Sequence, residues 1–131
     1  MAGSGAAHLR PPEQSLLRAE NLTVEFDLGR KGVVKAVSGI SIDVVEGETL
    51  GLVGESGCGK STVASALLHL LPPNGEITAG AMIFRGQDLR SLDAAAFRRL
   101  RGTEMSMIFQ DPATSLNPVF SVGDQMYDIR R

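Results

Sequence analysis

The chain has 131 residues, of which 43% are hydrophobic and 21% are charged, and its formal net charge is −2. This length is typical of a single domain, and the lack of a basic excess excludes nucleic acid as the main partner. The single cysteine, Cys58, excludes an internal disulfide framework and favours a reducing cytoplasm.

Neither a targeting signal nor a membrane span is predicted. The start of the chain, MAGSGAAHLRPPEQ, lacks the basic segment and apolar core of a secretory signal. The most apolar stretch, Val63–Leu71, is too short to cross a bilayer and is interrupted by His69. We therefore expect any membrane association to come through a partner.

A tail and a β-hairpin are predicted at the N-terminus. Residues 1–15 are small, polar and proline-containing, so we expect a disordered tail, with order beginning at Leu16. The stretch LLRAENLTVEFDL alternates, with Leu22, Val24 and Phe26 on one side, as in a half-buried strand. The turn sequence GRKG and the β-rich VVKAVSGISIDVV follow, which predicts an antiparallel pair.

A strand, a glycine-rich loop and a helix are predicted next. The apolar run TLGLVG favours a strand that is buried on both faces. The segment KSTVASALLHLL has helical spacing and is stopped by Pro72 and Pro73. The apolar face of this helix is formed by Val63, Ala66, Leu67, Leu70 and Leu71.

Four further elements are predicted towards the end of the chain. AGAMIFRGQDL is typical of a strand with a turn, and EMSMIFQ of another strand. LDAAAFRRLRG predicts a short helix with Asp93 near its start and Gly102 near its end. A last helix begins within SVGDQMYDIRR, where a serine or an aspartate is the expected N-cap. No stop signal follows, so we expect Arg131 to lie in the middle of an element.

The segment LGLVGESGCGKST contains a phosphate-binding motif, because its residues fit the pattern G-x-x-x-x-G-K-[ST]. Glycines let the backbone wrap around an anion, and the helix that starts at Lys60 adds its positive N-terminal end. Lys60 is predicted to reach the β and γ phosphates, Ser61 to ligate Mg²⁺, and Thr62 to lie near the α phosphate. The predicted binding residues of this loop are Gly54, Glu55, Ser56, Gly57, Cys58, Gly59, Lys60, Ser61 and Thr62. The alternative is a glycine-rich turn with a surface lysine.

The segment GETLGLVGESGCGKST, followed by MSMIFQDPATSLNP, resembles the N-terminal half of an ATP-binding cassette (ABC) transporter ATPase. Within that superfamily, MIFQDP followed by TSLNP is similar to the group of dipeptide, oligopeptide and nickel importers. The resemblance covers residues 16–131. It implies an α/β fold, in which an N-terminal antiparallel β subdomain leads into a P-loop NTPase core that is incomplete at its C-terminus. It also implies ATP and Mg²⁺ as cofactors.

The resemblance gives roles to two residues outside the loop. Gln110 matches the Q-loop glutamine, whose side chain meets Mg²⁺ or the attacking water. The implied catalytic residues are therefore Lys60 and Gln110, and the implied metal ligands are Ser61 and Gln110. Phe26 matches the aromatic residue on which adenine stacks, an interaction that tolerates any base. The structural alternatives are a core position for Phe26 and an ordinary polar residue at a strand end for Gln110.

Other residues also have two interpretations. Cys58 is either a redox-sensitive thiol or a loop residue that contributes only its backbone, and we favour the second. His69 is interpreted as structural. The arginines between Arg98 and Arg101 form either a solvated helix face, which we favour, or a docking patch.

The residues that complete ATP hydrolysis in this family are not found. These are an apolar strand ending in Asp-Glu, a switch histidine and a signature like LSGGQ. Asp111 follows an apolar stretch, but it precedes a proline and belongs to the Q-loop pattern. We expect a fragment or a degenerate relative that binds ATP but does not hydrolyse it alone. An exposed apolar sheet edge would then favour poor solubility or dependence on a partner.

The resemblance implies an ATP-binding subunit of an ABC importer, which couples ATP binding and hydrolysis to the uptake of peptides or nickel. The implied partners are transmembrane permease subunits, a second ATPase subunit in a homo- or heterodimer, and indirectly a substrate-binding protein. The implied location is the cytoplasmic face of the plasma membrane. The alternatives are a non-catalytic or regulatory P-loop module and another soluble P-loop NTPase. The β-rich stretch before the loop and IFQDP after it favour the transporter.

Overall fold

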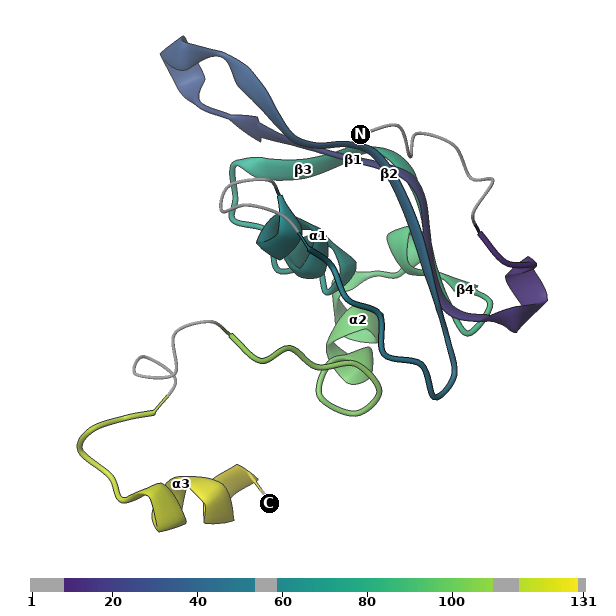
Figure 1. The fold of residues 1–131 in the computed structure, drawn as a ribbon. Coiled ribbons are helices and arrows are strands. Elements are labelled where there is room, and N and C mark those ends of the chain that lie inside the picture. The colour runs from purple at the N-terminus through teal and green to yellow at the C-terminus, as the bar shows by residue number, and fades with distance from the viewer. Residues whose placement is uncertain (1–8, 54–58, 110–115, 130–131) are drawn as a thin grey trace.

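The computed structural model describes residues 9–53, 59–109 and 116–129. In this part of the chain, four strands form one antiparallel sheet in the order β2-β1-β3-β4 (Figure 1). The strands are β1 (Ser15–Asp27), β2 (Val33–Val45), β3 (Gly75–Phe84) and β4 (Gln87–Asp88). The α-helices are α1 (Lys60–Leu67), α2 (Ala94–Leu100) and α3 (Val122–Ile129). Single 3-10 turns lie at Pro12–Gln14, Gly29–Lys31 and Leu89–Ser91.

The predicted N-terminal hairpin is confirmed. Strands β1 and β2 pair antiparallel, and Phe26 lies opposite Val34. The 3-10 turn Gly29–Lys31 joins them where GRKG predicted a turn. Leu22 and Val24 are fully buried, as the alternation of the sequence predicts.

The hydrophobic core lies between one face of the sheet and the helices α1 and α2, which Figure 1 shows on the same side of the sheet. Its buried members come from the strands, both helices and the turn after β4. They are Ala19, Leu22, Val24, Val37, Val63, Ala66, Leu67, Met82, Phe84, Leu89, Phe97 and Leu100. Helix α1, which begins at the predicted phosphate loop, is therefore fixed to the sheet by apolar packing.

The structure places the end of the predicted tail, residues 9–15, against the sheet. We expected order to begin at Leu16, but β1 begins at Ser15 and Arg10 forms ion pairs with Asp43 and Glu48. The segment predicted a tail because it is small, polar and proline-containing, whereas a charged side chain, Arg10, fixes it to the sheet. Residues 1–8 lie outside the described part of the chain.

Two predicted strands do not form in the described residues. Residues 48–53, within TLGLVG and just before it, have no regular secondary structure, and Val53 is 97% exposed. Residues 106–109 of EMSMIFQ also have none, and Ile108 is 97% exposed. A strand that is buried on both faces needs strands beside it and helices over it. No described segment supplies those neighbours, so apolar sequence alone does not make these stretches strands.

Helix α1 ends earlier than predicted, at Leu67 rather than Leu71. The backbone N–H of Leu70 donates to the carbonyl of Ser65 at 2.8 Å, and that of His69 donates to Ala66 at 3.1 Å. This pair of bonds is the Schellman ending of a helix, with His69 in the position that glycine usually occupies. The φ of His69 is accordingly +53°.

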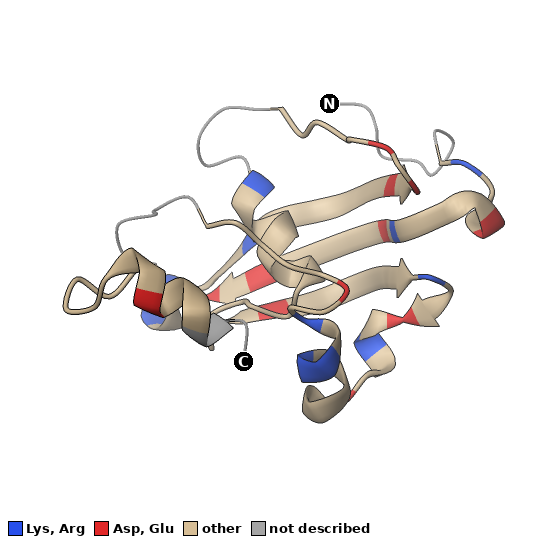
Figure 2. Cartoon of the chain, turned by 90° about the horizontal axis from the view of Figure 1, so that it is seen from below, with Lys and Arg blue, Asp and Glu red and all other residues tan. Residues whose placement is uncertain are grey.

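The ring of His69 stacks on the ring of Phe97 with 3.9 Å between centroids and 15° between planes. The stacking packs the side chain of His69 against α2 at the point where α1 ends, before the two prolines. The structural interpretation of His69 is confirmed. On the same helix as Phe97, Arg98 and Arg99 are exposed, which agrees with a solvated face; α2 shows its basic residues in blue in Figure 2.

The predicted starts of α2 and α3 are confirmed by their capping side chains. Asp93 Oδ1 accepts a hydrogen bond from the N–H of Ala96 at 2.7 Å. Ser121 Oγ accepts one from the N–H of Asp124 at 3.1 Å. Both side chains satisfy donors that a helix leaves unpaired in its first turn. None of the described helices is long and apolar enough to cross a membrane.

Candidate functional site

The candidate site begins at Gly59, the residue directly before α1. Its φ is +96°, a conformation that favours glycine. The first helical bond runs from the N–H of Val63 to the carbonyl of Gly59 at 2.9 Å. Because glycine has no side chain that could cap the helix, the N–H groups of the first turn are suited to an external anion.

Gly59 lies against a β-bulge in β2. Val24 pairs with Val37 and Glu25 pairs with Lys35, which leaves Ala36 as the extra residue. A Cβ on Gly59 would lie only 2.6 Å from the carbonyl oxygen of Ala36. A side chain at position 59 would therefore collide with the backbone of β2. The close approach fixes the end of the predicted loop on the sheet.

The next residues of the motif form the first turn of α1. Ser61 is exposed, whereas Lys60 and Thr62 are half-buried and Val63 is buried in the core. The helix is thus anchored by its apolar face while its polar residues lie at the N-terminal end. The predicted loop residues Gly54, Glu55, Ser56, Gly57 and Cys58 lie outside the described residues, as does Gln110.

Phe26 lies at the end of β1, between Val34 of β2 and Gly75 of β3. Its ring is half-buried and packs against the core. The core contact expected from the structural alternative is therefore present. Because Val34 and Ala36 are close neighbours on β2, the structure brings Phe26 and Gly59 to the same part of the sheet. The adenine-stacking role of Phe26 stays a prediction.

Two contributors to the site were missed from the sequence. Ala36 supplies the bulge that receives Gly59, and Gly75 lies beneath the ring of Phe26. The bulge left no signal in the sequence, since it depends on the pairing of two strands. Gly75 did leave one, because a glycine in a strand often marks the close approach of another group.

An ion-pair cluster fixes the turn where β2 leads towards the loop. Arg10 Nη2 lies 2.8 Å from Asp43 Oδ1, and Arg10 Nη1 lies 2.5 Å from Glu48 Oε2. Hydrogen bonds from the Arg10 guanidinium hold the pKa values of both carboxyl groups below their usual range. A pocket of about 360 Å³ adjoins the cluster and is lined by Arg10, Ile42, Asp43, Glu48, Leu50, Gly51 and Leu52.

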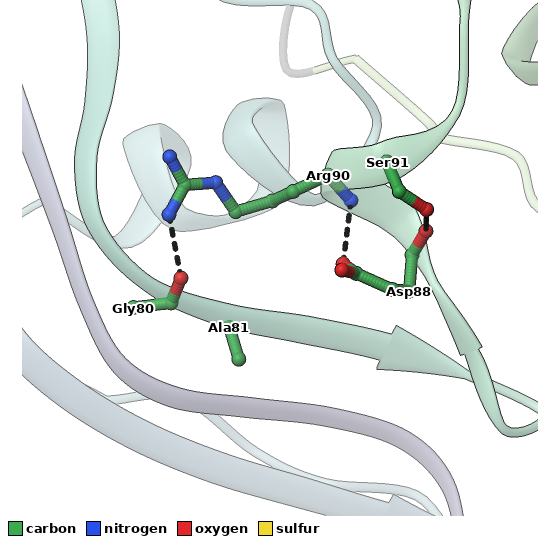
Figure 3. A pocket seen from close by; sticks show the side chains of 5 residues that line it. All are labelled: Gly80, Ala81, Asp88, Arg90 and Ser91. Carbon is green, nitrogen blue, oxygen red and sulfur yellow. Dashed lines mark hydrogen bonds between the residues drawn. The ribbon is translucent and has the colours of Figure 1, made fainter.

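A second pocket, of about 370 Å³, lies at the outer edge of β3 (Figure 3). It is lined by Gly80, Ala81, Asp88, Arg90 and Ser91. Arg90 donates to the carbonyl of Gly80 at 2.6 Å and to that of Ile77 at 3.3 Å. These bonds occupy backbone acceptors of β3 beyond its short pairing with β4. Arg90 therefore closes the edge of the sheet, which otherwise would be open to strand pairing.

Comparison with known proteins gives one consistent family. The family model described as ABC transporter matches residues 37–130. The dipeptide transport ATP-binding protein DppD of Bacillus subtilis (strain 168) is 46% identical over 86% of the chain. The oligopeptide transport ATP-binding protein AmiE of Streptococcus pneumoniae (serotype 4 strain) is 43% identical over 87% of the chain, and the oligopeptide transport ATP-binding protein OppD of Haemophilus influenzae is 46% identical over 87%.

These alignments cover 34%, 32% and 35% of the three relatives. The chain therefore spans about a third of the length of the curated relatives that it matches. The family match, residues 37–130, includes the phosphate-binding motif.

Proposed function

The chain belongs to the ABC transporter family, and on that premise we propose that it binds the triphosphate of ATP at residues 54–62. The observation that carries the proposal is the position of Gly59, held between the β2 bulge and the start of α1. This arrangement supports the proposal, because the motif requires the N-terminal turn of a helix directly after its glycine-rich loop.

The residues fit a nucleotide with its metal ion. Lys60 would contact the β and γ phosphates, and the exposed hydroxyl of Ser61 is a suitable oxygen ligand for Mg²⁺. Mg²⁺ would neutralise part of the phosphate charge. Thr62 would lie near the α phosphate, Gln110 would be the further metal ligand, and Phe26 would stack on the base.

As part of the same proposal, we extend to this chain the function for which the relatives are named. Their names describe dipeptide and oligopeptide transport ATP-binding proteins. The chain would then contribute the N-terminal part of an ATP-binding subunit, with residues 16–131 as its nucleotide-binding region. Its partners would be permease subunits and a second ATPase subunit, at the cytoplasmic face of the membrane. ATP hydrolysis would be coupled to peptide uptake in that assembly, and nickel is the alternative substrate.

The experiment is a calorimetric titration of the 131-residue chain with ATP in the presence of Mg²⁺. Lys60→Ala should lower the affinity roughly 10- to 150-fold, because hydrogen bonds to charged groups contribute about 1.5–3 kcal/mol. The matched control is Lys31→Ala, which removes the same charge from the exposed hairpin turn. Full binding by Lys60→Ala would contradict the phosphate-loop assignment.

A further inference from the structure

The ring of Phe26 lies over the backbone of Gly75 in the neighbouring strand. The two residues are direct partners in the pairing of β1 with β3. A Cβ on Gly75 would lie 2.8 Å from Cε1 of Phe26, 3.2 Å from Cδ1 and 3.3 Å from Cζ. The aromatic ring therefore occupies the space that any side chain at position 75 would need.

The strands cannot separate easily at this point. The next pair of residues is joined by two hydrogen bonds between Asp27 and Asn74. The N–H of Asp27 donates to the carbonyl of Asn74 at 2.9 Å, and Asn74 Nδ2 donates to the carbonyl of Asp27 at 3.1 Å. The N–H of Gly75 also donates to the carbonyl of Pro72 at 2.8 Å. A new Cβ at position 75 would consequently displace the ring rather than the backbone.

Gly75 has no left-handed φ, unlike eight other glycines of the described residues. Alanine can therefore adopt its backbone conformation without strain. The three atoms nearest to a Cβ at this position all belong to the ring of Phe26, which separates the role of Gly75 from that of a turn residue.

We propose that Gly75 is a positioning residue for nucleobase stacking, because it sets where the ring of Phe26 lies relative to the loop. This inference rests on the proposed function, since it concerns the base of the nucleotide whose phosphates the loop would hold. Gly75 itself does not touch the base. It acts through the ring, so its effect must depend on the presence of Phe26 and must spare the phosphates.

The test compares ATP with tripolyphosphate, which has the phosphates and lacks the base. Affinities of both are measured with Mg²⁺ for the 131-residue chain and for Gly75→Ala, Phe26→Ala and the double variant. Phe26→Ala should lower ATP affinity about 5- to 150-fold, the range for base stacking on an aromatic residue, and leave tripolyphosphate unchanged. Gly75→Ala should lower ATP affinity by about threefold or more, also without affecting tripolyphosphate.

The double variant decides whether Gly75 acts through the ring. In the Phe26→Ala background, Gly75→Ala should have no further effect on ATP, so the two changes are not additive. Gly123→Ala is the matched control, because its Cβ would meet only Ser121 Oγ at 3.9 Å. Thermal unfolding of each variant separates a loss of folding from a loss of stacking, and Gly75→Ser repeats the test with a different side chain.

Three results would overturn the inference. They are an unchanged affinity for ATP in Gly75→Ala, an equal loss of affinity for ATP and for tripolyphosphate, and additive effects in the double variant. None of these results contradicts the proposed function if the binding of ATP still depends on Lys60. If the unaltered chain binds neither ligand, the proposed function itself is wrong.

Discussion

The carbonyl oxygen of Ala36 lies 2.6 Å from the point where a Cβ would be placed on Gly59. The φ of Gly59 is also +96°, so Gly59→Ala combines a backbone collision with a strained conformation. We expect this variant to lose about 1–3 kcal/mol in the free energy of unfolding. Urea denaturation measures the loss, with Gly123→Ala as the unstrained control. Equal urea midpoints for Gly59→Ala and the unaltered chain would show that the contact is not restrictive.

The contact between His69 and Phe97 predicts a dependence of stability on pH. Burial, followed by the charges of Arg101 and Arg90, lowers the pKa of His69 from 6.5. The folded chain therefore binds this proton less readily than the unfolded chain. The stability that neutral His69 contributes is complete above pH 6.5 and is lost as pH falls through the lowered pKa.

Urea midpoints recorded across this pH window test the prediction. In His69→Gln, the part of the pH dependence of the urea midpoint that comes from this histidine should disappear, because glutamine does not titrate. If the urea midpoint changes with pH identically in the variant and in the unaltered chain, the titrating group is a residue other than His69.

The ion pairs of Arg10 predict a second dependence at lower pH. The pKa of Asp43 is lowered from 3.8 by Arg10, and that of Glu48 is lowered from 4.5 by the same side chain. The stability from these pairs is present above those values and is lost as pH falls through the lowered pKa values. Arg10→Met should therefore reduce the urea midpoint near neutral pH, and the difference should shrink in acid.

The matched control is Arg30→Met, in the exposed hairpin turn, which should leave the midpoint almost unchanged. Arg10 is 34% exposed, so solvent screening weakens its pairs, and the buried Asp43 carries most of the effect. A difference between Arg10→Met and the unaltered chain that is constant with pH would rule out these carboxyl groups as its source.

We predict no ATP hydrolysis above background by the 131-residue chain. Phosphoryl transfer needs an acid to hold Mg²⁺ and a group to orient the attacking water. The sequence has no Asp-Glu pair, and its histidines, His8 and His69, both precede Gln110. Phosphate release should be the same for the unaltered chain and for Lys60→Ala. Turnover that requires Lys60 would reveal a catalytic acid that the sequence analysis missed.

Features decided by neighbouring residues were predicted well from the sequence. The alternation around Leu22 and Val24 gave the buried face of β1, and the aspartate at position 93 gave the start of α2. Gly59 and Lys60 were placed correctly at the junction of loop and helix. In each case the cause lies within a few residues, as an alternating pattern, a side-chain cap or a permitted φ.

Features decided by distant residues were not predicted. Helix α1 ends at Leu67 instead of continuing to Leu71, at the point where His69 packs on the ring of the distant Phe97. The position of Gly59 depends on a bulge in another strand, and the described part of TLGLVG, residues 49–53, is not a strand because it lacks neighbours on both faces. The position of Phe26 was predicted from alternation, but its contact with Gly75 required the register of β1 and β3.

The most direct test of the central claim, that residues 54–62 hold the phosphates of ATP, is amide NMR of the 131-residue chain titrated with ATP and Mg²⁺. Backbone N–H groups that bind phosphate should show the largest shifts, so the changes should concentrate at the loop and at Lys60, Ser61 and Thr62. Tripolyphosphate should reproduce these shifts. Changes confined to other parts of the sheet, or no change at saturating ATP, would contradict the claim.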